Sequence, residues 1–186
     1  MPAKTKITKE DIIQAAVASV REKGESSINA RSIAAALNCS TQPIFSNFAS
    51  MQDLRIAVVE RADKLCEEYM KREVELAVYP TYKAMGMAYI RFAKEEKRLF
   101  QLLYMRDRSE EVIPNETAQT VNVVNVIRNA TGLDEDLAKL FQLEMWAYVH
   151  GVASMYATGF LNLEWDLVSK MLTDAYLGLR KQYGME

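Results

Sequence analysis

The sequence is poor in residues that cross-link a chain or hold a metal ion. Its 186 residues include two cysteines and one histidine. Cys39 and Cys66 lie far apart and form no Cys-x-x-Cys pair, which excludes a disulfide-stapled fold and favours the reducing cytoplasm. His150 has Ala147 three positions before it instead of a glutamate, so the di-metal pattern of helical bundles is missing. We therefore expect no metal ion and no cofactor.

The usual catalytic motifs are missing as well. The chain contains no His-Glu-x-x-His, no P-loop glycine pattern and no Gly-x-Ser-x-Gly. Carboxylate pairs such as Glu67–Glu68 and Glu95–Glu96 lie in charge-rich helical stretches, which is typical of a solvated surface. The sequence therefore predicts no catalytic residues, and we do not expect an enzyme.

Long hydrophobic runs are also lacking. No apolar segment of the secretory type follows the first residues. The longest uncharged run, Met145–Leu163, contains His150, Gly151 and Asn162 and is not continuously apolar. We expect a buried helix end there, no membrane span, and a cytoplasmic protein.

The residues that are present predict an all-α fold. Hydrophobic residues make up 49% and charged residues 26%, an ordinary composition for a globular protein. Apolar positions recur every three or four residues, and no segment alternates as a strand would. We predict a helix from the Thr8-x-x-Asp11 capping box to Lys23, and a long helix from Ser50 to about Val78, which Pro80 ends. Later helices are predicted around Tyr82–Phe92 and Leu99–Leu103, from about Val121 to near Gly132, from Asp134 to about Phe160, and over Trp165–Tyr183.

The stretch Asn29–Leu54 has the pattern of a helix-turn-helix. Asn29 is a predicted N-cap for a short helix, and Asn38 follows where the chain must turn. Ser40 or Thr41 then caps a second short helix that runs to about Asn47. Pro43 falls within the first turn of this helix, where a missing N–H group costs little.

This stretch carries a family resemblance. Ile28–Leu54 resembles the DNA-binding signature of the TetR family of one-component bacterial repressors, without a gap. The match comprises Ile33-Ala34, then Leu37-Asn38-Cys39, then Phe45-Ser46-Asn47-Phe48. The resemblance implies a three-helix head, joined through a long fourth helix to a helical bundle. We accordingly predict a DNA-binding domain over residues 1–50 and an effector-binding and dimerisation domain over residues 51–186.

Charge and position suggest the residues that contact DNA. Residues 1–50 contain six Lys and Arg against four Asp and Glu, although the whole chain has a net charge of −2. The second short helix of a helix-turn-helix enters the major groove, and we expect Gln42 to read a base there. We expect Phe45 and Phe48 to pack within the head. The complete predicted set of DNA-contacting residues is Lys4, Lys6, Arg31, Ser40, Thr41, Gln42, Pro43, Phe45, Ser46 and Asn47.

A second resemblance lies in the C-terminal half. Trp146-Ala-Tyr-Val-His150-Gly151 is similar to a tryptophan-to-histidine-glycine stretch of one TetR subgroup. An effector pocket of this architecture would be lined by aromatic residues and methionine, and we expect a small apolar or aromatic effector. The predicted ligand-binding residues are Tyr89, Tyr104, Trp146, His150 and Met155. Ordinary core packing is the alternative for each of them.

The last helix has more apolar surface than one neighbour requires, which indicates burial on two sides. In the family, the two C-terminal helices pair with those of a symmetry mate, and this implies a homodimer. The predicted interface residues are Val168, Met171, Leu172, Ala175 and Leu179. Burial of both apolar stripes within one subunit is the alternative.

The resemblance thus implies a transcriptional repressor that a small-molecule effector releases from a palindromic double-stranded DNA operator. Four residues depart from the family pattern: Asn38, Phe45, Asn47 and Met51 replace the usual Gly, Tyr, His and Lys. Phe45, Asn47 and Met51 leave one alternative function, a helical small-molecule-binding or interaction module with weak or lost DNA binding.

Overall fold

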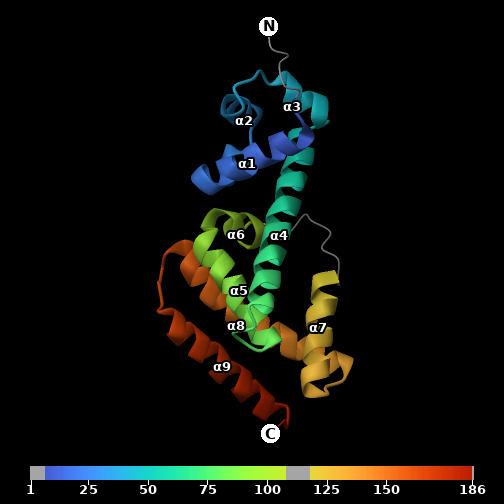
Figure 1. Cartoon of the computed structure of the whole chain (residues 1–186), viewed down its shortest axis with the longest axis vertical. Helices are drawn as coiled ribbons and strands as arrows, with labels where there is room; N and C mark the ends of the chain where they lie inside the picture. The colour runs from blue at the N-terminus through green and yellow to red at the C-terminus, as the bar shows by residue number, and fades with distance from the viewer. Residues whose placement is uncertain (1–6, 108–117, 186) are drawn as a thin grey trace. The chain divides into compact units, whose positions relative to one another are not determined.

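The computed structural model describes residues 7–107 and 118–185 (Figure 1). This part of the chain forms α-helices and one short 3₁₀ helix, without strands, which confirms the predicted all-α fold. The elements are α1 (Lys9–Lys23), η1 (Glu25–Ser27), α2 (Ala30–Ala36), α3 (Gln42–Asn47), α4 (Met51–Glu75), α5 (Thr81–Glu95), α6 (Lys97–Tyr104), α7 (Ala118–Thr131), α8 (Glu135–Thr158) and α9 (Trp165–Gln182).

The helices belong to two compact units, and the chain passes from the first to the second within α4. The first unit comprises the chain up to Leu65 together with Glu96–Arg106, so α6 belongs to it. The second unit comprises Cys66–Glu95 and the chain from Asp107 onward. The predicted functional boundary near residue 50 stays a prediction.

Most helix starts follow the predicted caps, but the predicted cap of α3 is wrong in one respect: Thr41 is its N-cap residue, and no side chain makes a capping hydrogen bond there. The Thr8 side chain accepts a hydrogen bond from the Asp11 N–H group, and the Asp11 carboxylate accepts one from the Thr8 N–H group. At α4, Ser50 Oγ accepts from the Asp53 N–H group at 3.1 Å, and the Asp53 carboxylate accepts from the Ser50 N–H group at 3.0 Å. Each pair satisfies two backbone donors that the first helical turn leaves without a partner.

Helix ends differ from the prediction in two places. The long helix α4 ends at Glu75 and not at Val78, because Ala77 adopts a left-handed conformation with φ of 51°. Similarly, α8 ends at Thr158, where the left-handed Gly159 caps it before Phe160. Residues in this conformation commonly end helices, and periodicity alone does not locate them.

The first unit is built around one face of α1. Ile12, Ala16, Val17 and Val20 of this helix are buried, and α1 packs against α2, α3 and α6. The Arg21 guanidinium donates two hydrogen bonds to the Glu96 carboxylate, at 2.7 and 2.8 Å. α1 thus connects the helix-turn-helix to α6 within this unit.

The second unit is centred on α8, which packs against α5, α7 and α9 (Figure 1). Phe141, Val152 and Tyr156 are among its buried side chains. α5 and α9 approach closely at Gly86, where a Cβ atom would lie 3.2 Å from Leu172 Cδ2. Glu73 is buried near the end of α4 and accepts hydrogen bonds from the Arg91 guanidinium at 3.2 and 3.4 Å.

Candidate nucleic-acid interface and ligand pocket

The short helix α3 presents a polar face to solvent. Ile44 is buried on its inner side, and Gln42 and Ser46 are exposed on the outer side. The preceding turn is made by Asn38, whose φ of 50° is the left-handed conformation predicted for it. Pro43 lies in the first turn of α3, also as predicted.

The predicted DNA-contacting residues fall into three groups. Arg31, Ser40, Gln42, Phe45 and Ser46 are exposed, and Thr41, Pro43 and Asn47 are half-buried. Lys4 and Lys6 lie outside the described residues. Their roles in DNA binding stay predictions.

Two of the polar side chains on α3 bind their own helix. Ser46 Oγ donates to the Gln42 carbonyl at 2.9 Å, and Asn47 Nδ2 donates to the Pro43 carbonyl at 2.8 Å. The structure shows no side-chain hydrogen bond from Gln42 to another described residue. The amide of Gln42 is therefore the polar group on α3 that is most free to bind a base edge.

The two phenylalanines of the head differ. Phe48 is 4% exposed, as predicted, and the Lys9 ammonium lies 5.1 Å from the centre of its ring. Phe45 is 55% exposed, so its predicted packing within the head is wrong. The reason is geometric: Ile44 points to the inner face, and Phe45, the next residue of the helix, projects about 100° away from it.

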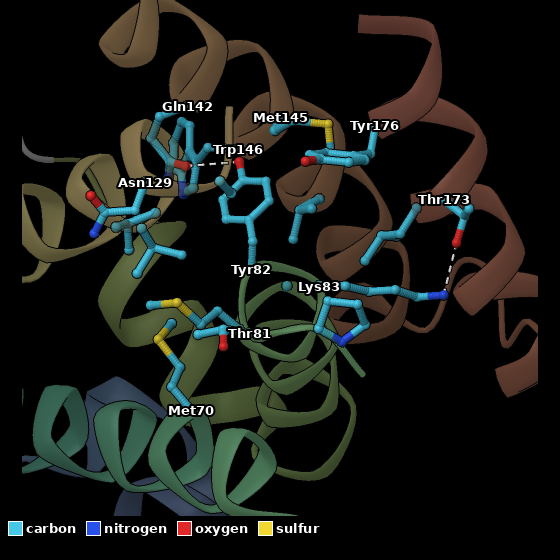
Figure 2. Close-up of a pocket in the computed structure, with 18 of the residues that line it drawn as sticks. Met70, Thr81, Tyr82, Lys83, Asn129, Gln142, Met145, Trp146, Thr173 and Tyr176 are labelled. Atoms are coloured by element: carbon cyan, nitrogen blue, oxygen red, sulfur yellow. Dashed lines mark hydrogen bonds between the residues drawn. The ribbon is translucent and has the colours of Figure 1, made fainter. Parts of the chain in front are cut away.

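The second unit contains a pocket of about 700 Å³ (Figure 2). This volume lies within the usual range for drug-sized ligands. Side chains from α4, α5, α7, α8 and α9 line it, and most of them are apolar. The lining residues include Met70, Met85, Val123, Val126, Met145, Trp146, Val149, Leu172, Tyr176 and Leu177.

Two hydrogen-bonded pairs provide polarity within this lining. The Tyr82 hydroxyl donates to Gln142 Oε1 at 2.9 Å, and Lys83 Nζ donates to Thr173 Oγ1 at 2.8 Å. Burial, with the nearby Tyr176 hydroxyl as a second cause, raises the pKa of Tyr82 well above its ordinary value of 10.0, so this hydroxyl keeps its proton. Figure 2 shows the two pairs joining α5 to different helices, Tyr82 to α8 and Lys83 to α9.

The predicted ligand-binding residues do not all meet at this pocket. Trp146 lines it, whereas Tyr89, His150 and Met155 lie elsewhere in the second unit and Tyr104 belongs to the first. His150 stacks on Trp146, with ring centres 4.9 Å apart and an interplanar angle of 26°. The Tyr89 hydroxyl and His150 Nδ1 share a hydrogen bond of 2.9 Å. The ligand-binding roles of all five predicted residues stay predictions.

Several polar lining residues were not among the predicted ligand-binding residues, including Tyr82, Lys83, Gln142 and Thr173. The apolar stripe that contains Tyr82 and Met85 was a usable signal for Tyr82, since it predicted one face of a helix. Lys83, Gln142 and Thr173 lie outside the predicted apolar stripes, and only the packing of the helices brings them together.

The predicted dimer residues are divided between the interior and the surface of α9. Val168 and Leu172 are buried within the protomer, and Leu172 lines the pocket. Met171, Ala175 and Leu179 are half-buried. Large exposed apolar side chains on the two last helices are Leu137, Leu140, Leu143, Trp146, Tyr148, Leu167 and Leu177.

An N-terminal helix-turn-helix followed by a helical unit with an apolar pocket defines the class of helical transcriptional regulators. Residues 82–175 match the family model described as "Tetracyclin repressor-like, C-terminal domain". This match spans half of the chain. The chain belongs to the TetR family of transcriptional regulators, whose members are not enzymes.

Solved structures show the same fold. A TetR-like transcriptional regulator from Rhodococcus sp. RHA1 is 16% identical, with a TM-score of 0.68, covering 95% of this chain and 96% of that chain. A TetR family member from Streptomyces coelicolor A3 is 15% identical, with a TM-score of 0.64 and coverages of 90% and 96%. No match was found among curated proteins. Within the described residues, no helix is long and apolar enough to span a membrane.

Proposed function

We propose that this regulator is a homodimeric repressor of a palindromic operator and that a small molecule bound in the second unit releases it. Residues 1–50 bind DNA in this proposal, and residues 51–186 bind the effector and the partner subunit. The observation that carries the proposal is the combination of an exposed polar face on α3 with an apolar pocket of about 700 Å³ in the second unit.

The DNA-binding part of the proposal rests on α3. Its exposed Gln42 amide has the two hydrogen-bonding groups that pair with adenine in the major groove. Arg31 is exposed on α2 and serves as a phosphate contact. Two such heads, held by a dimer, contact successive major grooves about one helical turn apart.

The effector-binding part rests on the walls of the pocket. Several helices that pack against one another contribute side chains, so a ligand that fills the pocket changes how they pack. A ligand that favours the arrangement unable to bind DNA shifts the population toward it. A preference of about 1.4 kcal/mol is enough for a tenfold fall in operator affinity.

The test is a fluorescence-anisotropy titration with DNA from upstream of the protein's own gene, at two salt concentrations. Gln42→Ala is expected to cost about 1–3 kcal/mol on the preferred sequence and to relax preference at one base position. Arg31→Ala is expected to weaken binding to all sequences alike and to flatten the salt slope. Ser26→Ala is the control, because Ser26 is exposed on η1, away from α3 in the sequence.

The same titration distinguishes the repressor from the alternative function, a ligand-binding module with lost DNA affinity. One observation favours that alternative: α3 contains no charged side chain. Weak binding without sequence preference or salt dependence, unchanged by Gln42→Ala and Arg31→Ala, would support it and contradict the repressor.

A further inference from the structure

We propose that the pocket of the second unit binds an apolar carboxylate, whose anionic group pairs with Lys83 while its body fills the space between α5, α7 and α8. The inference deepens the proposed function by naming the chemical class of the effector, and it rests on the assignment of this pocket as the effector site. It stands on three features: the charge of the lining, the environment of the Lys83 ammonium, and the composition of the remaining walls.

Lys83 supplies the charge of the pocket. Among the described residues that line the pocket, Lys83 is the one with a charged side chain, and no aspartate or glutamate accompanies it. No described carboxylate lies within ion-pair distance of Lys83 Nζ. The lining therefore has a positive charge that the protein itself does not balance.

Neutral partners hold the ammonium in place. Lys83 Nζ donates to Thr173 Oγ1 at 2.8 Å, and the Thr173 hydroxyl donates its own proton to the Ser169 carbonyl at 3.0 Å. The Tyr79 ring centre lies 4.9 Å from Lys83 Nζ. Since an ammonium has three N–H donors and Thr173 receives one, donors remain for a ligand. A carboxylate would accept from them in a charge-assisted bond, which is stronger than a neutral one.

The remaining walls suit a neutral, apolar body. Met70, Met85 and Met145 contribute adaptable thioether side chains. The Tyr82 hydroxyl and the Gln142 amide already bond to each other, and burial keeps Tyr82 protonated. Tyr82 and Lys83 are consecutive on a helix, so they project about 100° apart. The cation is thus separated from the Tyr82–Gln142 pair (Figure 2), and a ligand with one charged end matches this arrangement.

The experiment compares ligands that differ only in the charged group. Isothermal titration calorimetry of the full chain near neutral pH would measure decanoate, decan-1-ol and decylamine below their aggregation limits. A second arm, 2-naphthoate against 2-naphthylmethanol, separates aromatic from alkyl carboxylates. Decanoate or 2-naphthoate is expected to bind about tenfold more tightly than its alcohol, equivalent to about 1.4 kcal/mol, and decylamine is expected to bind most weakly.

Lysine variants connect this preference to one residue. Lys83→Met removes the charge and keeps an unbranched side chain, so the carboxylate is expected to bind only as tightly as the alcohol, whose affinity stays unchanged. Lys83→Arg is expected to keep the preference. Lys139→Met is the matched control, since Lys139 lies on α8 outside the pocket lining and pairs with Glu135 at 2.8 Å.

Three results would overturn the inference: equal affinities for the carboxylate and the alcohol in both arms, a parallel loss of both in Lys83→Met, or no binding of any of the five compounds. A preference in one arm alone supports it and identifies the body as alkyl or aromatic. The proposed function is tested separately by adding the bound carboxylate to the operator titration. If binding depends on Lys83 but operator affinity is unchanged, the inference holds and effector-controlled repression fails.

Discussion

His150 connects a residue of the pocket lining to a buried residue of α5. Its ring stacks on Trp146, and its Nδ1 atom shares a hydrogen bond with the Tyr89 hydroxyl. Tyr89 is buried, and burial above all raises the pKa of its hydroxyl well beyond the ordinary value of 10.0. Burial lowers the pKa of His150 from its ordinary value of 6.5, so the imidazole is neutral in the folded protein at neutral pH.

This depressed pKa predicts a stability loss in mild acid. As the pH falls through about 6.5, the unfolded chain takes up a proton that folded His150 resists, so the free energy of unfolding decreases. The midpoint of urea denaturation should therefore be lower near pH 5.5 than near pH 7.5. Because His150 is the one histidine of the chain, His150→Gln should remove most of that difference. An equally large difference in the variant would show that another group is responsible.

Among the helices, α4 begins, like α1, with a reciprocal pair of capping hydrogen bonds. The reciprocal hydrogen bonds between Ser50 and Asp53 satisfy backbone donors at the first turn of this 25-residue helix, which continues from the first unit into the second. Its cap is exposed, so its contribution comes from hydrogen bonding and not from packing.

Removing this cap is expected to lower the stability of the folded protein. Ser50→Ala should lower the free energy of unfolding by about 1 kcal/mol, the usual cost of losing an N-cap side chain. Urea denaturation followed by circular dichroism measures it. Ser46→Ala is the control, because exposed Ser46 bonds only to the Gln42 carbonyl of its own helix. It should change stability by less than about 0.5 kcal/mol, and equal losses in both variants would rule out a specific role for the cap.

The helix starts could be predicted from the sequence because their causes are local. Thr8, Asn29, Ser50 and Asp134 each cap a helix through a residue three positions later. Helix ends were harder to predict, because alanine rarely adopts the left-handed conformation that Ala77 has.

The pocket required information that no local pattern contains. Periodicity places Tyr82 and Tyr89 on the same apolar face of α5, yet one lines the pocket and the other binds His150. The difference arises from which neighbouring helix each side chain meets. Likewise, Val168 and Leu172 belong to an apolar stripe that a partner subunit or the protomer itself can cover, and the structure buries them in the protomer.

For the whole molecule, the exposed apolar side chains of α8 predict the oligomeric state. Leu137, Leu140 and Leu143 follow one another at spacings of three residues along this helix and are exposed, and a group of exposed apolar side chains commonly marks an interface. We expect a dimer in sedimentation experiments and a shift of Leu143→Glu toward the 21.2 kDa monomer, because a buried carboxylate without a partner is costly. Ile56→Glu, on exposed Ile56 of α4, should stay dimeric. A dimer that survives Leu143→Glu would place the interface elsewhere.

The first unit is assembled from two separate stretches of the chain, since α6 returns to pack on α1 after α5 has been completed. During synthesis on the ribosome, the helix-turn-helix therefore emerges before the segment that carries Glu96, the carboxylate that Arg21 binds. A truncated gene product ending near residue 65 would present the α6-facing side of α1 to water. The first unit thus reaches its final packing only after α5 and α6 have been translated.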